Sequence, residues 1–224
     1  MERLLAEDLV LLCWDDEKGK PHAKCSTGFS TGIAGALLID AMGVGALEVL
    51  DDRVHPTGTA PSDPLLAAVV ADTERARKPK KVKDLVGHLD NRKRTNAVLD
   101  RMVESGALRR QEHRVLGLFP VTRRPTADTR TAKAVRGQVR DLLLGRRRPG
   151  DGDSHAVLLA KLARSTGALN VLVERKQRKE AQRRADGFDV GSDVPEAVAK
   201  AIQQAQAAVM AAIAAGGAAA GAGS

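Results

Sequence analysis

The fold is decided by residues 32–49, which read GIAGALLIDAMGVGALEV. Ile33, Leu37 and Leu38 recur at the spacing of one helix face, and this spacing predicts a helix over residues 29–42. Glycines recur at small-residue spacing in and just before this helix, which lets another backbone approach closely. The segment therefore predicts a helix that packs closely against another element.

The end of this segment predicts a β-hairpin. Residues 45–50 and 53–56 are short extended runs around an Asp-Asp turn. The Gly-Ala-Leu triplet that opens the first run recurs sixty-one residues later, at residues 106–108. A second hairpin is expected over residues 108–121, with its turn at residues 112–113. The recurrence is either a structural repeat or a common way to end a helix in a hairpin, and the sequence leaves both interpretations open.

The rest of the chain predicts further helices. Apolar residues make up 43% of the 224 residues and aromatic residues only 2%, so the core is built from Leu, Val, Ile and Ala, which favour helices. The additional helices are expected from residue 5, over 64–74, around 85–89, and over 91–105, 132–144, 154–165, 170–184 and 193–213. We expect a mainly α protein, a single compact helical domain over residues 1–215 with two short β-hairpins. The Ala/Gly tail, residues 216–224, is expected to be disordered.

The chain is basic, with a formal net charge of +8 from 36 Lys and Arg against 28 Asp and Glu. This balance favours an anionic partner, which can be nucleic acid, anionic lipid or an acidic protein. Charge alone does not choose among these partners, and it also serves solubility.

Motifs for catalysis or metal binding are absent from the sequence. Cys13 and Cys25 form no C-x-x-C pair, the five histidines form no H-x-x-x-H pair, and neither a phosphate-binding loop nor a G-x-S-x-G elbow occurs. We therefore expect no metal, no cofactor and no enzymatic activity. No signal peptide and no apolar run of about 18 to 20 residues is present, which predicts a cytoplasmic protein that lies on a membrane, if it meets one.

Three stretches together resemble one known family. They are residues 4–20, LLAEDLVLLCWDDEKGK, residues 32–49 quoted above, and residues 101–128, RMVESGALRRQEHRVLGLFPVTRRPTAD. Their order and spacing resemble the Golgi phosphoprotein 3 family, including its bacterial members, over roughly residues 4–175. The bias towards Ala, Arg and Gly indicates a bacterial branch.

The resemblance implies a mostly helical domain from which one β-hairpin projects. It also implies function, because eukaryotic members bind phosphatidylinositol 4-phosphate on Golgi membranes and hold glycosyltransferases there through the cytoplasmic tails of those enzymes. The chain is therefore expected to be a peripheral membrane protein that binds phosphoinositide-like head groups reversibly at the cytoplasmic face. Its expected partners are an anionic phospholipid membrane and, as an adaptor, the cytoplasmic tails of membrane enzymes.

The family's lipid pocket uses a Trp and an Arg near the start of the second helix, and two Arg one turn apart on the helix that ends before Gly106. Arg92 stands at the first position of that Arg pair and Thr95 at the second. Ala34 stands at the position of the second-helix Arg, and Cys25 at that of the Trp. One of the four pocket residues therefore matches the family pattern.

The candidate head-group residues are the basic side chains at or near these positions: Arg92, Lys93, Arg94 and Lys24. We expect Arg92 and its basic neighbours to face residues 24–26, because the second helix begins at that segment and its unpaired N–H groups attract anions. A hydroxyl donor is expected from Ser26, Thr27 or Ser30. The alternative is that Arg92 pairs with Asp90 or Asp100 at the surface.

The second hairpin is the other candidate contact. Leu116, Leu118 and Phe119 offer apolar side chains for insertion into a membrane or for contact with a second subunit in a homo-oligomer. Ordinary core packing is the competing interpretation of the same three residues.

Two other functions fit the residues. Residues 85–121 run helix, basic helix, strand, turn, strand, which is typical of a winged-helix nucleic-acid-binding protein. A scaffold that binds only proteins is the second alternative. Vesicle sedimentation compared with a duplex DNA shift at matched salt separates these functions.

Overall fold

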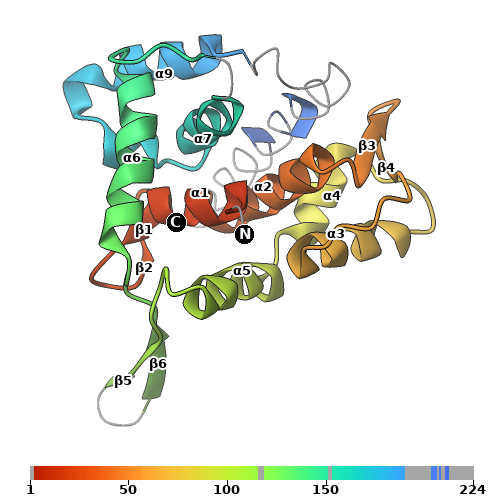
Figure 1. Cartoon of the computed structure of the whole chain (residues 1–224), viewed down its shortest axis with the longest axis horizontal. Coiled ribbons are helices and arrows are strands. Elements are labelled where there is room, and N and C mark those ends of the chain that lie inside the picture. Colours follow the sequence, from red (N-terminus) through yellow and green to blue (C-terminus); the bar gives the residue numbers. More distant parts are fainter. Residues whose placement is uncertain are drawn as a thin grey trace, which may run out of the picture.

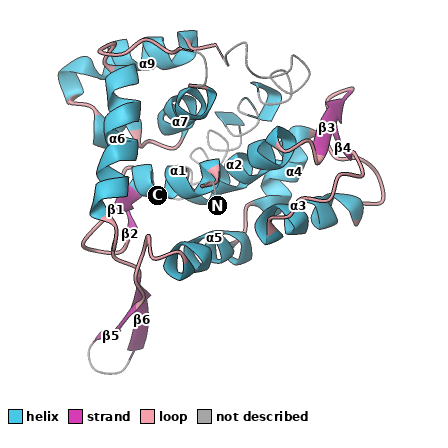
Figure 2. Cartoon of the chain, in the orientation of Figure 1, coloured by secondary structure: helices cyan, strands magenta, loops and turns pink. Residues whose placement is uncertain are grey.

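The computed structural model describes residues 3–115, 119–150, 153–189, and residues 203–205, 207, 210 and 211. Helices dominate this part of the chain, which confirms the predicted mainly α fold (Figures 1 and 2). In chain order the elements are α1 (Leu5–Cys13), β1 (Trp14–Asp15), β2 (Lys20–Pro21), α2 (Phe29–Gly43), β3 (Leu47–Leu50), β4 (Arg53–Pro56), α3 (Pro64–Glu74), α4 (Val82–Leu89), α5 (Arg92–Glu104), β5 (Gln111–Val115), β6 (Phe119–Arg123), α6 (Thr129–Leu143), α7 (Ser154–Ser165), α8 (Leu169–Leu172), the 3-10 helix η1 (Arg175–Gln177) and α9 (Arg178–Gly187).

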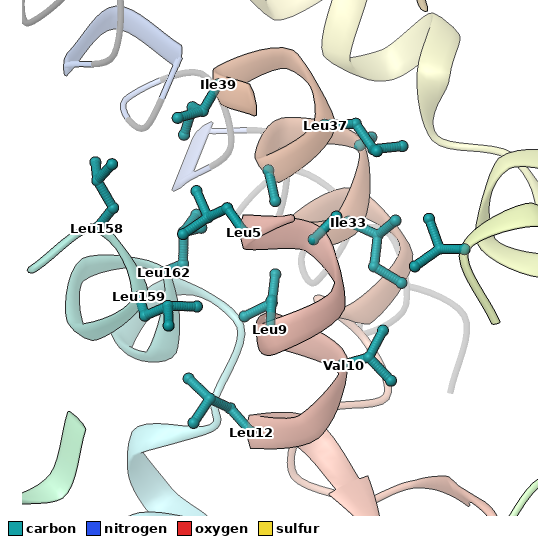
Figure 3. Close-up of a cluster of buried hydrophobic side chains, with 14 of the residues drawn as sticks. Leu5, Leu9, Val10, Leu12, Ile33, Leu37, Ile39, Leu158, Leu159 and Leu162 are labelled. Carbon is teal, nitrogen blue, oxygen red and sulfur yellow. The ribbon is translucent and has the colours of Figure 1, made fainter. Parts of the chain in front are cut away.

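Helices α1 and α2 pack against each other at the centre of the protein. Every residue of α1 is buried, and the buried leucines of α1, α2 and α7 interlock around it (Figure 3). The close approach of α1, α2 and α7 depends on Gly32, where a Cβ atom would lie 2.4 Å from Thr166 Cγ2 and 3.1 Å from a methyl carbon of Leu9. Helices α3, α4 and α5 cover α2, while α6 and α7 cover α1.

The strands form three separate two-stranded antiparallel sheets, β1–β2, β3–β4 and β5–β6, in the described part of the chain. Both expected hairpins are present, and β5–β6 extends away from the helices (Figure 1). The predicted turn at Glu112 and His113 is wrong, because both residues lie inside β5 and pair with Thr122 and Val121. The β1–β2 hairpin was not predicted, since its strands have only two residues each and show no alternation.

The recurrence in the sequence corresponds to two units of the same element order, α2–β3–β4 and α5–β5–β6. Each helix is followed by a glycine in the left-handed region, Gly45 with φ +71° and Gly106 with φ +78°. A residue with a Cβ atom adopts this conformation only with strain, so glycine is the natural residue after each helix.

The C-terminal part differs from the expectation of one helix over residues 170–184, because the chain there forms α8, η1 and α9 instead. The predicted disordered tail lies outside the described residues, so the division at residue 215 stays a prediction. Among the described helices, none combines the length and the apolar character needed to cross a bilayer.

Candidate functional site

The starts of α2 and α5 lie side by side and are joined by Asp90, the residue between α4 and the cap of α5. The Asp90 carboxylate accepts hydrogen bonds from the Ser30 hydroxyl and, at 2.5 Å, from Thr31 Oγ1 on the first turn of α2. Ser30 Oγ also lies 3.3 Å from Thr95 Oγ1 on α5. The first turns of these two helices, which are far apart in the sequence, therefore form one surface.

Helix α5 begins at this surface with a regular cap. Asn91 Oδ1 accepts a hydrogen bond from the backbone N–H of Arg94 at 2.9 Å, which satisfies one of the donors at the helix start. The next two side chains, Arg92 and Lys93, are exposed, and neither forms an ion pair with any residue that the structure describes. These two cations are free to meet an anion from solution.

The alternative pairing of Arg92 with Asp90 or Asp100 is not what the structure shows. Asp90 is occupied by the two hydroxyls of α2. Asp100 pairs with Arg110 at 2.8 Å and with Arg124 at 2.9 Å. Both carboxylates are thus engaged elsewhere.

Arg94 points away from Arg92 and Lys93 and into the contact between α5 and α3. Its Nη2 donates to the carbonyl of Ala68 at 2.7 Å and pairs with the carboxylate of Asp72, and its side chain is only 10% exposed. Burial disfavours the charge on Asp72, but the hydrogen bond from Arg94 and the nearby cations outweigh it and hold the pKa of Asp72 below its ordinary value. The structure therefore separates Arg94 from the other two cations and places it in helix packing.

Two of the other three family pocket positions are internal in this chain. Cys25 and Ala34 are fully buried. Cys25 hydrogen-bonds with the neighbouring thiol of Cys13, and this contact together with burial raises the pKa of Cys13 well above its usual range. Thr95, at the fourth position, is half-buried. Arg92 is thus the one family-matched position that offers a charge to the solvent.

Lys24 contacts the chain around α8. Its Nζ donates to the carbonyl of Asn170 on α8 at 3.2 Å, and its own carbonyl touches Gly167, where a Cβ atom would be 2.1 Å away. Leu116 and Leu118 lie outside the described residues, and of Phe119 the structure describes only the backbone, which pairs with Val115. The described residues contain no group of three His, Cys, Asp or Glu side chains that could hold a metal ion.

Sequence reasoning missed the role of Asp90, which it considered only as a partner of Arg92. No local signal marked this role, because Asp90 is not the cap of α5; Asn91 is. The hydroxyl pair that Asp90 binds lies about sixty residues earlier, and only the fold brings the two together.

The comparison with protein families agrees with the resemblance seen in the three stretches of sequence. A family model described as Golgi phosphoprotein 3 (GPP34) matches residues 5–205, which includes α1 to α9. A search of the curated proteins found no match for the chain. Because the family model covers most of the sequence, the chain belongs to the Golgi phosphoprotein 3 (GPP34) family.

Proposed function

We propose that this protein is a peripheral membrane protein that binds anionic, phosphoinositide-like head groups at the joined starts of α2 and α5. The observation that carries the proposal is that Arg92, at a head-group position of the family, and its neighbour Lys93 are exposed and form no ion pair in the described part of the chain. The N–H groups at the start of α5 add a favourable field for a phosphate. Membership of the family supports the same conclusion.

Asp90 limits how a phosphate can sit at this surface. The hydroxyls of Ser30 and Thr31 already donate hydrogen bonds to its carboxylate, so they are not free to donate to a ligand. A phosphate close to the first turn of α2 would also be repelled by this charge. The head group is therefore expected on the side of Arg92 and Lys93, above the start of α5.

Two cations do not suffice for tight binding. Each basic residue near an anionic leaflet contributes about 1 kcal/mol, whereas micromolar affinity needs about 8 kcal/mol. Further contacts must come from other basic residues or from the β5–β6 hairpin, where burial of one large apolar side chain contributes about 1.5 to 3 kcal/mol. We therefore propose a preference for anionic membranes in general rather than strict recognition of phosphatidylinositol 4-phosphate.

The same proposal makes the chain a non-enzymatic adaptor. It binds reversibly at the cytoplasmic face of a membrane and presents the tails of membrane enzymes, as the family resemblance implies. The β5–β6 hairpin, which extends away from the helices, is the segment proposed to enter the membrane or to meet a second copy (Figure 1).

Nucleic-acid binding is less well supported, although α4, α5, β5 and β6 follow the order of a winged helix. A recognition helix needs its cations free for phosphates and base edges. In α5, Arg94 is held by Asp72, and Arg101 pairs with Glu7 and Asp63. These internal contacts leave α5 with two free cations near its start.

The proposal is tested by sedimentation with vesicles of defined composition. Replacing both Arg92 and Lys93 with Ala should weaken binding to anionic vesicles about tenfold or more, because roughly 2 kcal/mol of attraction is lost. The matched control replaces Arg77 and Lys78 with Ala, which removes the same charge from an exposed loop. Equal losses of vesicle binding in both variants would show that binding depends on net charge alone. No loss in either variant would show that Arg92 and Lys93 do not form a membrane-binding site.

A further inference from the structure

A second basic region lies along the β1–β2 hairpin. The β1–β2 hairpin, the residues that follow it and α8 enclose an open groove of about 480 Å³. This volume lies within the range of about 300 to 1,000 Å³ that small-molecule sites occupy. The groove shares no residue with the surface formed by Arg92 and Lys93.

The charge in this groove is unbalanced. Three ammonium groups, from Lys18, Lys20 and Lys24, face one carboxylate, Asp15. Lys18 Nζ lies 3.3 Å from Asp15, whereas Lys20 is exposed and forms no ion pair with the residues that the structure describes. Lys24 donates to a backbone carbonyl, Asn170, which leaves its charge uncompensated. A groove of this composition attracts an anion with more than one negative charge.

The walls of the groove are held in place by the backbone. The turn of the hairpin presses against the chain after β6, since Gly19 has φ +59° and a Cβ atom there would lie 2.4 Å from the nitrogen of Arg124. Gly19 also accepts a hydrogen bond from that nitrogen at 3.1 Å. On the opposite wall, Arg178 Nη2 donates to the carbonyl of Asn170 at 3.0 Å and braces α8. A ligand would therefore enter a preformed site and would order little of the protein.

We propose that this groove binds a small soluble phosphorylated compound that carries at least two negative charges, such as a diphosphate or a bisphosphate ester. Lysine ammonium groups bind phosphate oxygens as point charges and tolerate different orientations of the ligand. The lining also includes His22, whose ring lies 3.9 Å from Asp15, and three apolar residues, Pro21, Ala23 and Val171, which offer contact to the uncharged part of such a compound. This assigns Lys24 to the groove, apart from Arg92.

The test is isothermal titration of the full chain with inorganic pyrophosphate. We expect saturable one-site binding that weakens about tenfold in Lys20→Glu, because one attractive contact becomes a repulsive one. Lys83→Glu makes the same change of charge on α4, away from the groove, and should bind pyrophosphate as the wild type does. Trp14, which pairs with the groove residue Pro21, is the single tryptophan and supplies a fluorescence signal for the same titration.

Three results would overturn the proposal. The first is that pyrophosphate shows no saturable binding. The second is that Lys20→Glu and Lys83→Glu weaken pyrophosphate binding equally. The third is that the Arg92 and Lys93 double variant weakens pyrophosphate binding and Lys20→Glu does not. Vesicle sedimentation of the same variants separates this site from the proposed membrane surface. If Lys20→Glu lost vesicle binding and the wild type did not bind pyrophosphate, the groove would hold a lipid head group and not a soluble ligand.

Discussion

In the first helix–hairpin unit, α2 is buried along most of its length and the β3–β4 hairpin packs against α3 and α4, whereas in the second unit α5 buries one side and β5–β6 extends outward (Figure 1). Val54 of β4 is fully buried, and its N–H donates to the carbonyl of Lys80 at 2.9 Å. The chain after β4 thus returns over its hairpin. The chain after β6 continues into α6, which packs on α1. The two units have the same order of elements, but the helices that follow each hairpin decide whether that hairpin is covered or extends outward.

Matched positions sixty-one residues apart show how the two units diverge. Leu37 and Val98 are both fully buried, so this position is a core position in each helix. Ile33, also fully buried, is matched by Arg94, whose guanidinium is held by Asp72. An apolar contact in the first unit is thus replaced by an ion pair in the second.

The largest expected effect concerns the shared core position. Leu37→Ala should lower the free energy of unfolding by about 2 to 5 kcal/mol, because it leaves a cavity beneath α3 and α4. Val98→Ala removes two carbon atoms and should cost about 2 kcal/mol. Urea denaturation of both variants measures the difference. A smaller loss for Leu37→Ala than for Val98→Ala would contradict the central position of α2.

The extent to which the sequence predicts the structure differs between local and distant features. Helices α3 and α7 were predicted to the residue, because Asp63 and Pro64 open α3 and regular apolar spacing marks both. The β1–β2 hairpin and the burial of Arg94 were not predicted. Arg94 looks in sequence like its neighbours Arg92 and Lys93, and only Asp72, on another helix, distinguishes it.

In the candidate site, too, contacts between residues distant in the sequence were not predicted. The sequence and the resemblance proposed Arg92 and expected it to face residues 24–26, and the contact that the structure shows between the two helix starts is the one between Ser30 and Thr95. Ser30 was one of three hydroxyls expected to serve a ligand, and it donates to Asp90 instead. Lys24 was grouped with Arg92 because both stand near family positions, and its contact with Asn170 depends on packing across the chain.

The next effect concerns the matched pair Asp40 and Arg101, which both reach the start of α1. Asp40 accepts the N–H groups of Leu5 and Ala6 at 3.0 and 3.2 Å, and burial raises the pKa of Asp40 to about 7 despite these bonds. The folded pKa lies above the unfolded value of 3.8, so this group costs stability progressively as the pH rises between these two values.

Replacing Asp40 with Asn removes this titration. The stability of Asp40→Asn relative to the wild type should rise by up to about 4 kcal/mol between about pH 4 and pH 8 for a shift of this size, on top of a pH-independent cost, because the amide nitrogen of Asn cannot accept one of the two N–H groups that Asp40 binds. Groups remote from Asp40 titrate equally in both proteins and cancel in the difference, which leaves Asp40 itself and the two groups that interact with it, Glu7 and His155. The check is urea denaturation of both proteins across this range, and a difference that does not change with pH would show that Asp40 is ionised throughout.

Arg94 is the next test of the divergence between units. Arg94→Ala should cost about 3 kcal/mol, because it leaves the carboxylate of Asp72 partly buried without its closest partner. Arg92→Ala, two residues earlier and exposed, should change the free energy of unfolding by less than about 0.5 kcal/mol. Thermal and urea unfolding measure both. Similar costs for the two variants would mean that Arg92 also supports the fold.

The smallest expected effect concerns the hairpin of the second unit. Replacing residues 113–121 with Asn-Gly would join Glu112 to Thr122 through a two-residue turn. In the described part of the chain β5 and β6 pack closely only against each other, while the base of the hairpin is held by the bonds of Arg110 and Arg124 to Asp100. Because this base is kept, the free energy of unfolding should change by less than about 0.5 kcal/mol.

The shortened protein also decides what the hairpin does. If it inserts in membranes, vesicle sedimentation should weaken while unfolding at any protein concentration stays the same. If it joins two copies, the wild type alone should unfold at a temperature that rises with protein concentration, because association stabilises the folded state by mass action. A loss of stability that is independent of concentration would instead show that β5–β6 packs on its own helices, as β3–β4 does, and would remove the contrast between the two units.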